Sequence, residues 1–203
     1  MYPVPDGDTG TNMLHTMRTA LQHARGAGPE PAALLAAAAH GALMGARGNS
    51  GVLLSQIIRG VKDACADDGI DVKKAFRLGR EYTFAAVTKP APGTMLTALA
   101  EMQEAVDQMK GGAEQLLGAA VDRGRAAVDR TMHDNPVNKA AGVVDAGARG
   151  LWLVLDGALA ALGGRFEPGA GSALSRAGGL RSERQRQGRP SATADEPPSW
   201  LGA

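Results

Sequence analysis

The amino-acid sequence predicts an all-α fold of about seven helices. Hydrophobic residues make up 44% of the 203 residues and aromatic residues only 3%, so the core must be built from Ala, Leu, Val and Met. Alanine has the highest helix propensity, whereas strands favour β-branched and aromatic side chains. No segment alternates apolar and polar residues for long enough to indicate a strand.

Apolar residues at helical spacing give the order of the expected helices. Residues 1–12 form a loop, because two prolines, two glycines and two aspartates lie within its first ten positions. The first helix begins near Asn12, with Thr11 or Asn12 as its N-cap, and ends at Gly26. Later helices are expected over residues 31–44, 50–64, about 72–87 after an Asp71 cap, about 95–106, 113–132 and 146–162.

The composition of the sequence changes after Gly163. Residues 164–203 are rich in Gly, Ser, Pro, Arg and Gln and have almost no apolar periodicity. Such a segment cannot bury enough surface to offset the entropy of ordering it. We therefore divide the chain into one domain over residues 1–163 and a disordered tail over residues 164–203.

Charge and composition argue against several classes of protein. A formal net charge of +1 gives no electrostatic case for nucleic acid or an anionic membrane, and a single cysteine allows no internal disulfide. The most apolar stretch, residues 151–162, is short and carries Asp156, so no membrane insertion is expected. The first residues hold no apolar signal-peptide segment, which makes a cytoplasmic protein the default expectation.

Glycine is concentrated in the breaks that precede the expected helices. The start of a helix presents N–H groups without partners and the positive end of the helix dipole, and glycine lets a phosphate approach the backbone. Several such loops at one end of a bundle would form an anion site of nucleotide size, although loops between helices are often Gly-rich without binding anything. The glycines are Gly7, Gly10, Gly45, Gly48, Gly51, Gly93, Gly142 and Gly147.

Two carboxylates lie one residue apart near the start of the sequence, at Asp6 and Asp8. Across the flexible Gly7 they can turn toward one centre, and Mg²⁺ in proteins is held by one or two carboxylates with water and phosphate oxygens. The alternative is an Asx-turn followed by a solvated acid.

The segment GARGNSG, residues 45–51, adds a second group of polar residues. We expect Ser50 to cap the third helix while facing phosphate, and Arg47 to stabilise charge on a transferring phosphoryl group. The alternative is an ordinary capped helix with a surface arginine. The sequence contains no GKS or GKT, so a Walker A loop is not supported.

Four segments together resemble the DhaL-type nucleotide-binding domain of dihydroxyacetone kinases, and most closely the N-terminal domain of the bacterial fatty acid kinase A subunit. They occur in the family's order: YPVPDGDTGTNM (2–13), GARGNSGVLLSQ (45–56), KPAPGTMLTAL (89–99) and AGVVDAGARGL (141–151). The resemblance implies an antiparallel barrel of amphipathic helices, eight in the family. It also implies that ATP and Mg²⁺ bind at one end of the barrel, where the γ-phosphoryl group is transferred.

The resemblance further implies which residues form the site. Asp6 and Asp8 would bind magnesium, and with Arg47 they form the expected catalytic group. The nucleotide (ATP or ADP) would be held by residues from all four segments: Thr9, Asn12, Asn49, Ser50, Gly51, Thr94, Met95, Asp145, Ala146 and Gly147.

The sequence also departs from the family pattern. Family members begin with a helix and a further metal ligand before the segment that matches Tyr2, whereas this sequence starts inside that motif. We hypothesise that the start site has been assigned too late. The acceptor-binding domains of the family are not recognised either, so we expect the domain to be inactive alone and to need a partner protein that binds a fatty acid or another substrate.

The favoured function is therefore ATP- and Mg²⁺-dependent phosphoryl transfer to a fatty acid on a carrier protein. Three alternatives stay open: a partner-dependent subunit of a dihydroxyacetone kinase, a truncated remnant without catalysis, and a helical interaction module whose acids and glycines only form turns.

Overall fold

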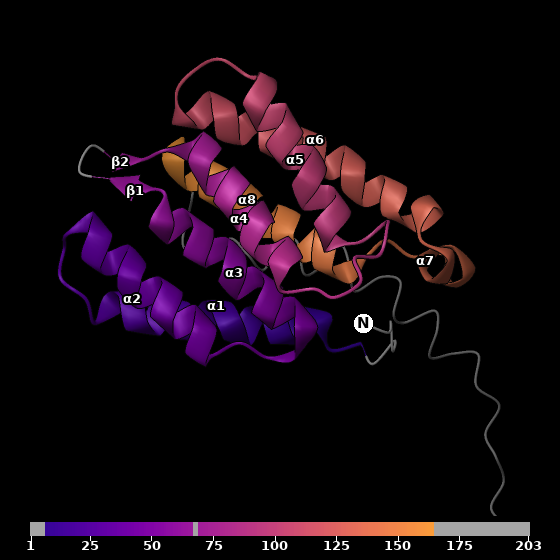
Figure 1. Cartoon of the computed structure of the whole chain (residues 1–203), viewed down its shortest axis with the longest axis horizontal. Coiled ribbons are helices and arrows are strands. Elements are labelled where there is room, and N and C mark those ends of the chain that lie inside the picture. The colour runs from indigo at the N-terminus through magenta and orange to yellow at the C-terminus, as the bar shows by residue number, and fades with distance from the viewer. Residues whose placement is uncertain (1–6, 67–68, 165–203) are drawn as a thin grey trace, which may run out of the picture. The chain divides into compact units, whose positions relative to one another are not determined.

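The structure is a computed structural model that describes residues 7–66 and 69–164. These residues form eight α-helices and a small antiparallel hairpin (Figure 1). The all-α class is confirmed, whereas Asp6 and the predicted tail beyond Gly164 lie outside the described residues. The elements are α1 (Thr9–Arg25), α2 (Pro31–Met44), α3 (Gly48–Asp63), β1 (Cys65–Ala66), β2 (Gly69–Ile70), α4 (Val72–Ala85), α5 (Met95–Gln108), α6 (Ala113–Asp134), α7 (Pro136–Ala141) and α8 (Ala146–Leu162).

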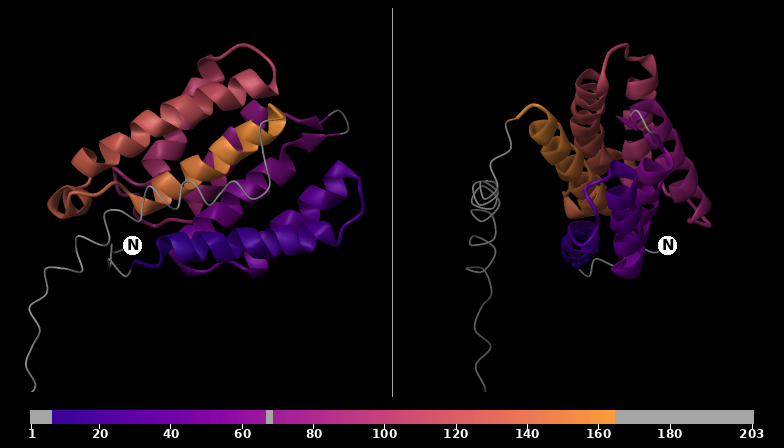
Figure 2. Two further views of the ribbon diagram at one scale, coloured as in Figure 1. Left: turned by 180° about the vertical axis from the view of Figure 1, so that it is seen from behind. Right: turned by 90° about the vertical axis from the view of Figure 1, so that its left-hand side faces the viewer.

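Six of these helices form a closed ring. In order around the ring they are α1, α3, α4, α5, α6 and α8, and α8 packs back against α1. Helix α2 packs outside the ring against α1 and α3. Figure 2 shows α8 between α6 and α1. Because short connections reverse the chain direction, α1, α3, α5 and α8 all begin at the end of the ring where α2, α4 and α6 finish (Figure 1).

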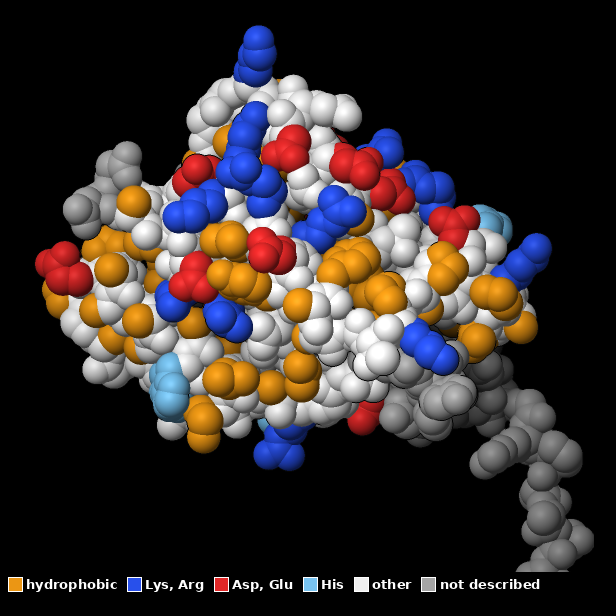
Figure 3. Space-filling model, in the orientation of Figure 1, with side chains coloured by type: hydrophobic (Ala, Val, Ile, Leu, Met, Phe, Trp, Pro, Cys, Tyr) orange, Lys and Arg blue, Asp and Glu red, His pale blue; other side chains and the backbone are white. Residues whose placement is uncertain are grey.

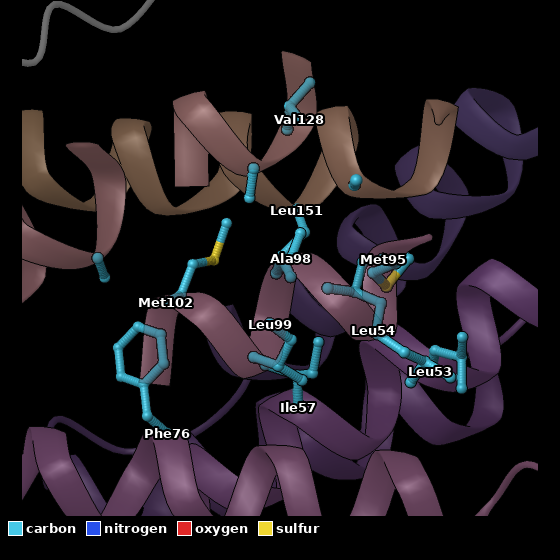
Figure 4. Packing of buried hydrophobic residues seen from close by; sticks show 14 of the residues in the cluster. Leu53, Leu54, Ile57, Phe76, Met95, Ala98, Leu99, Met102, Val128 and Leu151 are labelled. Atoms are coloured by element: carbon cyan, nitrogen blue, oxygen red, sulfur yellow. The ribbon is translucent and has the colours of Figure 1, made fainter. Parts of the chain in front are cut away.

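The core inside the ring is built from the aliphatic residues that the composition predicted. Leu54, Leu99 and Leu151 are each at most 1% exposed, and Met102 is fully buried. Figure 4 shows these side chains meeting from α3, α5 and α8. Within the described residues, Phe76 is the only aromatic member among the buried residues of this cluster. Small residues replace aromatic volume by letting helices pack closely, as expected for a core of this composition.

Most helix boundaries agree with the sequence prediction, but two starts were placed too late. Helix α1 begins at Thr9 with Asp8 in the N-cap position, so the predicted caps at Thr11 or Asn12 are wrong. Helix α3 begins at Gly48, so Ser50 lies inside the helix and does not cap it. The Asp71 cap of α4 is confirmed, because its carboxylate accepts the Lys74 N–H at 2.9 Å.

Two elements were missed by the sequence prediction. The strands β1 and β2 pair Cys65 with Ile70, and two-residue strands are too short to show alternation. Helix α7 lies between the helices predicted over residues 113–132 and 146–162, with Asn135 as its N-cap and Pro136 as its first helical residue. Proline is favoured at this position because its missing N–H would have no intrahelical partner there.

Charged side chains and exposed apolar ones both lie on the face of the molecule that Figure 3 draws. Figure 3 shows charged side chains gathered over α5 and α6, while helix α2 leaves Leu43 and Met44 more than half exposed. The four histidines are all exposed, and so none lies in the core. No helix among the described residues combines the length and apolarity needed to cross a membrane.

Candidate functional site

The four segments that carry the predicted site residues lead into helices α1, α3, α5 and α8. The starts of these helices lie at one end of the ring (Figure 1). Helices α1 and α8 approach each other closely, because a Cβ atom placed on Gly150 would lie 2.5 Å from the Sδ atom of Met13. A helix N-terminus carries N–H groups without intrahelical partners and the positive end of the dipole. The fold therefore brings together four helix ends of the kind that suits an anion.

The start of α1 presents a carboxylate and three backbone N–H groups. Asp8 is exposed at the N-cap position, and its side chain makes no capping hydrogen bond. Its carbonyl oxygen accepts the first helical hydrogen bond, from the Asn12 N–H at 2.8 Å. Among the described residues, no side chain caps the N–H groups of Thr9, Gly10 and Thr11. The Asp8 carboxylate is therefore exposed at a helix start that no described side chain caps.

The start of α3 has the same character. Arg47 occupies the N-cap position, is exposed, and makes no capping hydrogen bond through its side chain. The first helical hydrogen bond runs from the Gly51 N–H to the Arg47 carbonyl at 3.0 Å. The N–H groups of Gly48, Asn49 and Ser50 therefore precede the hydrogen-bonded part of the helix, with Asn49 exposed and Ser50 half-buried.

Glycines allow α1 and α3 to touch at this end. Gly48 has a φ of +56°, and a Cβ atom placed on it would lie 2.6 Å from Nδ2 of Asn12. A Cβ atom on Gly51 would lie 2.6 Å from Oγ1 of Thr16, whose buried hydroxyl donates to the Asn12 carbonyl at 2.9 Å. The predicted site residues Asn12 and Gly51 thus hold two helix starts side by side.

The starts of α5 and α8 are joined by one carboxylate. Asp145, half-buried, is the N-cap of α8 and accepts the Ala148 N–H at 2.7 Å. Burial raises the pKa of Asp145 above its usual value of 3.8, and this is opposed by hydrogen bonds from the backbone of three residues: Ala148, Met95 and Gly147. Met95 is the first residue of α5. The Asp145 side chain is therefore engaged by the protein's own backbone at both helix starts.

The other predicted residues at the starts of α5 and α8 differ in how far they are exposed and in whether their side chains are free to face a ligand. Thr94 is the half-buried N-cap residue of α5, but its hydroxyl donates to the Ala91 carbonyl at 2.9 Å and does not cap the helix. The Met95 side chain is 3% exposed and belongs to the core (Figure 4), which leaves its backbone as the part near the site. Ala146 is exposed and Gly147 is buried.

The predicted metal ligands are only partly described. Asp6 lies outside the described residues, so its pairing with Asp8 stays a prediction. Within residues 7–66 and 69–164, no group of three or more His, Cys, Asp or Glu side chains is placed to hold a metal ion. An ion at Asp8 would therefore need water and phosphate oxygens to complete its shell, which is the usual arrangement for Mg²⁺.

The sequence prediction missed a group of polar residues on the junction between α6 and α7. Asn138 donates from Nδ2 to the Gly93 carbonyl, in the loop before α5, at 3.3 Å. Thr131 accepts the Asp145 N–H at 2.8 Å. An Asn-Pro pair is a typical helix start and could have identified α7, but no sequence signal names the distant partners of these side chains.

Comparisons with known proteins agree on the type of domain. The family model described as the DAK2 domain matches residues 3–160. The chain is 35% identical to Protein YloV of Bacillus subtilis strain 168 over 176 residues, which is 83% of this chain and 32% of YloV. It is 37% identical to an uncharacterized protein of Staphylococcus aureus strain USA300 over 173 residues, covering 81% of this chain and 31% of that protein. The chain thus spans about a third of the length of the curated relatives it matches.

Proposed function

We propose a function from the premise that this chain belongs to the DAK2 domain family, the DhaL-type domain of the dihydroxyacetone kinases. The chain would be an ATP- and Mg²⁺-dependent nucleotide-binding domain of a phosphotransferase. The observation that carries this proposal is the pair of adjacent helix starts, at α1 and α3, that no described side chain caps. Backbone N–H groups in such a pair are a typical binding surface for phosphate.

Other helices of the chain show what an ordinary start looks like. Helices α4, α7 and α8 are capped by the side chains of Asp71, Asn135 and Asp145, each of which accepts an N–H group of the first turn. Helix α6 has no side-chain cap, because its N-cap residue is Gly112. Helix α2 has no side-chain cap, but Pro31 at its first position has no N–H to satisfy. A side-chain cap stabilises a helix by about 1 kcal/mol. The lack of this stabilisation at two touching helices is explained if a ligand binds their N–H groups.

The residues at these two helix starts fit a magnesium–nucleotide complex. Asp8, with Asp6 as its proposed companion, would hold the ion, and the N–H groups over residues 9–11 and 48–50 would hold phosphate oxygens. Gly10 leaves room for close approach, because a Cβ atom placed on it would meet nothing within 4 Å. Bound Mg²⁺ would neutralise charge on the phosphates, and the exposed Arg47 would stabilise charge on the transferred phosphoryl group.

The remaining residues would hold the nucleoside. We propose that Thr94, Asp145 and Ala146, with the backbone of Met95 and Gly147, form the wall against which the base and ribose lie. Asp145 would act there mainly by holding the wall in place, since its carboxylate is engaged by backbone N–H groups.

The phosphate acceptor is proposed from the resemblance of the four segments. The segments resemble the fatty acid kinase branch, so we propose a fatty acid bound to a carrier protein as the acceptor and a cytoplasmic location. The domain would act with that partner. Activity with dihydroxyacetone and a substrate-binding subunit, in place of the fatty acid, would instead identify a dihydroxyacetone kinase subunit.

Calorimetric titration of the full chain with ADP tests the nucleotide-binding proposal. Binding that requires Mg²⁺ and is lost in Asp8→Ala supports it. Weak binding that is indifferent to Mg²⁺ and to Asp8 would identify a remnant without catalysis. The absence of any binding would leave a helical interaction module and overturn the proposal.

A further inference from the structure

The junction between α6 and α7 holds three polar side chains that the proposed function does not use. Thr131 is 1% exposed, Asn135 is 8% exposed, and Asn138 is half-buried. Polar groups at this depth need hydrogen-bond partners, because an unsatisfied buried group is destabilising. Their partners lie in the two loops that lead into α5 and α8.

Asn135 joins α7 to the loop before α5. Its Oδ1 atom accepts the N–H groups of Val137 at 2.9 Å and of Asn138 at 3.4 Å, which starts α7. Its Nδ2 atom donates to the Pro92 carbonyl at 3.2 Å. One side chain therefore both begins the short helix and holds the loop.

Asn138 holds the next residue of the same loop. Its Nδ2 atom donates to the Gly93 carbonyl at 3.3 Å and to the Thr131 carbonyl at 3.2 Å. Gly93 has a φ of +64°, and a Cβ atom placed on it would lie 2.7 Å from the Asn135 backbone nitrogen. The loop before α5 thus lies directly on the α6–α7 junction.

Thr131 extends the connection to the loop before α8. Its Oγ1 atom accepts the Asp145 N–H at 2.8 Å and donates to the Val128 carbonyl at 2.6 Å. The Asp145 carboxylate in turn accepts N–H groups of α8 and of Met95, at the start of α5. The hydrogen bonds therefore form a circuit from the loop over residues 92–93 through α7 and Thr131 to Asp145, whose carboxylate lies against the starts of α8 and α5.

We propose that Thr131, Asn135 and Asn138 are positioning residues of the nucleotide site, which hold the starts of α5 and α8 in the arrangement that the nucleoside requires. This inference rests on the proposed function. A fully satisfied polar network has one discrete arrangement, so the two loops cannot shift independently while it is intact. The site has two halves: the starts of α1 and α3, which would hold phosphate, and the starts of α5 and α8, which would hold the nucleoside. None of the three residues belongs to the α1–α3 half.

The test compares two ligands on the full 203-residue chain: Mg²⁺-ADP, which needs both halves, and Mg²⁺-tripolyphosphate, which needs only the α1–α3 half. Asn138→Ala removes both donors of that side chain. Asn135→Asp keeps the oxygen that caps α7 and removes the donor to Pro92, which guards against a loss of folding. Val137→Ala on the same helix, 42% exposed, is the matched control.

We expect affinity for Mg²⁺-ADP to fall about tenfold in Asn138→Ala and Asn135→Asp, since a lost hydrogen bond and a tenfold change in affinity are of similar size. Affinity for Mg²⁺-tripolyphosphate should not change, and Val137→Ala should alter neither. Equal ADP affinity in folded variants would overturn the inference, as would a parallel loss of both ligands, which indicates only a structural role.

Failure of the proposed function gives a different result, because the unaltered chain would then bind neither ligand. In that case amide hydrogen exchange still decides whether the circuit exists. Faster exchange of the Asp145 and Met95 N–H groups in Asn138→Ala, with the Gly51 N–H unchanged, supports it. Unchanged exchange at all three overturns it.

Discussion

Both halves of the candidate site are made of two helix starts, but the halves differ in whether side chains of the protein cap those starts. At α1 and α3 the helix starts touch through glycines, and no described side chain caps their N–H groups. At α5 and α8 the Asp145 carboxylate accepts N–H groups from both helices, and the α6–α7 junction holds the loops from behind. All four starts have the same dipole and the same backbone chemistry.

What differs is whether the protein satisfies those N–H groups itself. In the α1–α3 half no described side chain satisfies them, and we propose that a charged ligand does, whereas the α5–α8 half uses them to fix its own geometry. Under this proposal, a helix start becomes a binding surface through the side chains it lacks as much as through the glycines it has. The two halves should respond differently to substitution, and four predictions test this difference.

The largest effect is expected at Asp8. Asp8→Ala should reduce Mg²⁺-dependent affinity for ADP by about two orders of magnitude, because Mg²⁺ is held by only one or two protein carboxylates. Asp122→Ala removes the same charge from the exposed face of α6 and should leave affinity unchanged. Calorimetry with and without Mg²⁺ measures both, and equal affinities in the two variants would contradict the role given to Asp8.

The second-largest effect is expected at the contact between α1 and α3. Gly51→Ala should destabilise the fold by about 2 kcal/mol, because its Cβ atom would meet the buried Thr16 hydroxyl in a packed helix crossing. Gly118→Ala is the control, since a Cβ atom there meets nothing within 4 Å and alanine is the better helix former. Urea unfolding should show opposite signs for the two, and a Gly51→Ala protein as stable as the unaltered one would refute the close approach.

The network behind α5 and α8 should give a somewhat smaller effect. Thr131→Val should destabilise the fold by about 1.5 kcal/mol, because it leaves the Asp145 N–H without its acceptor. Thr83 is equally buried, but its hydroxyl only donates, to the Gly79 carbonyl within the same helix. Thr83→Val orphans no N–H group, so its unfolding free energy should fall less. If the order is reversed in urea unfolding, the Thr131–Asp145 link does not stabilise the fold as described.

The smallest effect concerns the pH dependence of stability. Burial raises the pKa of Asp145 above 3.8, so between 3.8 and the raised value the folded state binds more protons than the unfolded state. Protonation then stabilises the fold as pH falls through the folded pKa. Relative to Asp145→Asn, the free energy of unfolding of the unaltered chain should increase as pH falls over that range.

Asp63 provides the opposite sign for comparison. A hydrogen bond from the Lys62 side chain is the largest cause that lowers the pKa of Asp63 below 3.8. The stabilisation from ionised Asp63 is present above pH 3.8 and is lost as pH falls through the folded pKa. Relative to Asp63→Asn, the unaltered chain should therefore become less stable as pH falls. Urea unfolding at several pH values, with NMR titration of both carboxyl groups, measures the two slopes. Parallel slopes would mean that burial does not dominate at Asp145.

The sequence predicted the helices better than it predicted their first residues. Asn12 and Ser50 were expected as caps because such side chains favour that position, but α1 and α3 begin earlier. Contacts between the two helices, such as that of Gly48 with Asn12, accompany these starts. Local preference could not anticipate them, since it compares only neighbouring positions. The binding roles of the site residues stay predictions.

By itself, the sequence determined the helical class, the order of the helices and the glycine-rich segments before four of them. These features depend on periodicity and propensity within a few residues along the chain. Only the tertiary structure decided which helix starts meet and which of them the protein caps for itself. The bond from Asn138 to Gly93 joins residues 45 positions apart, and only packing of the whole ring brings such groups within hydrogen-bond distance.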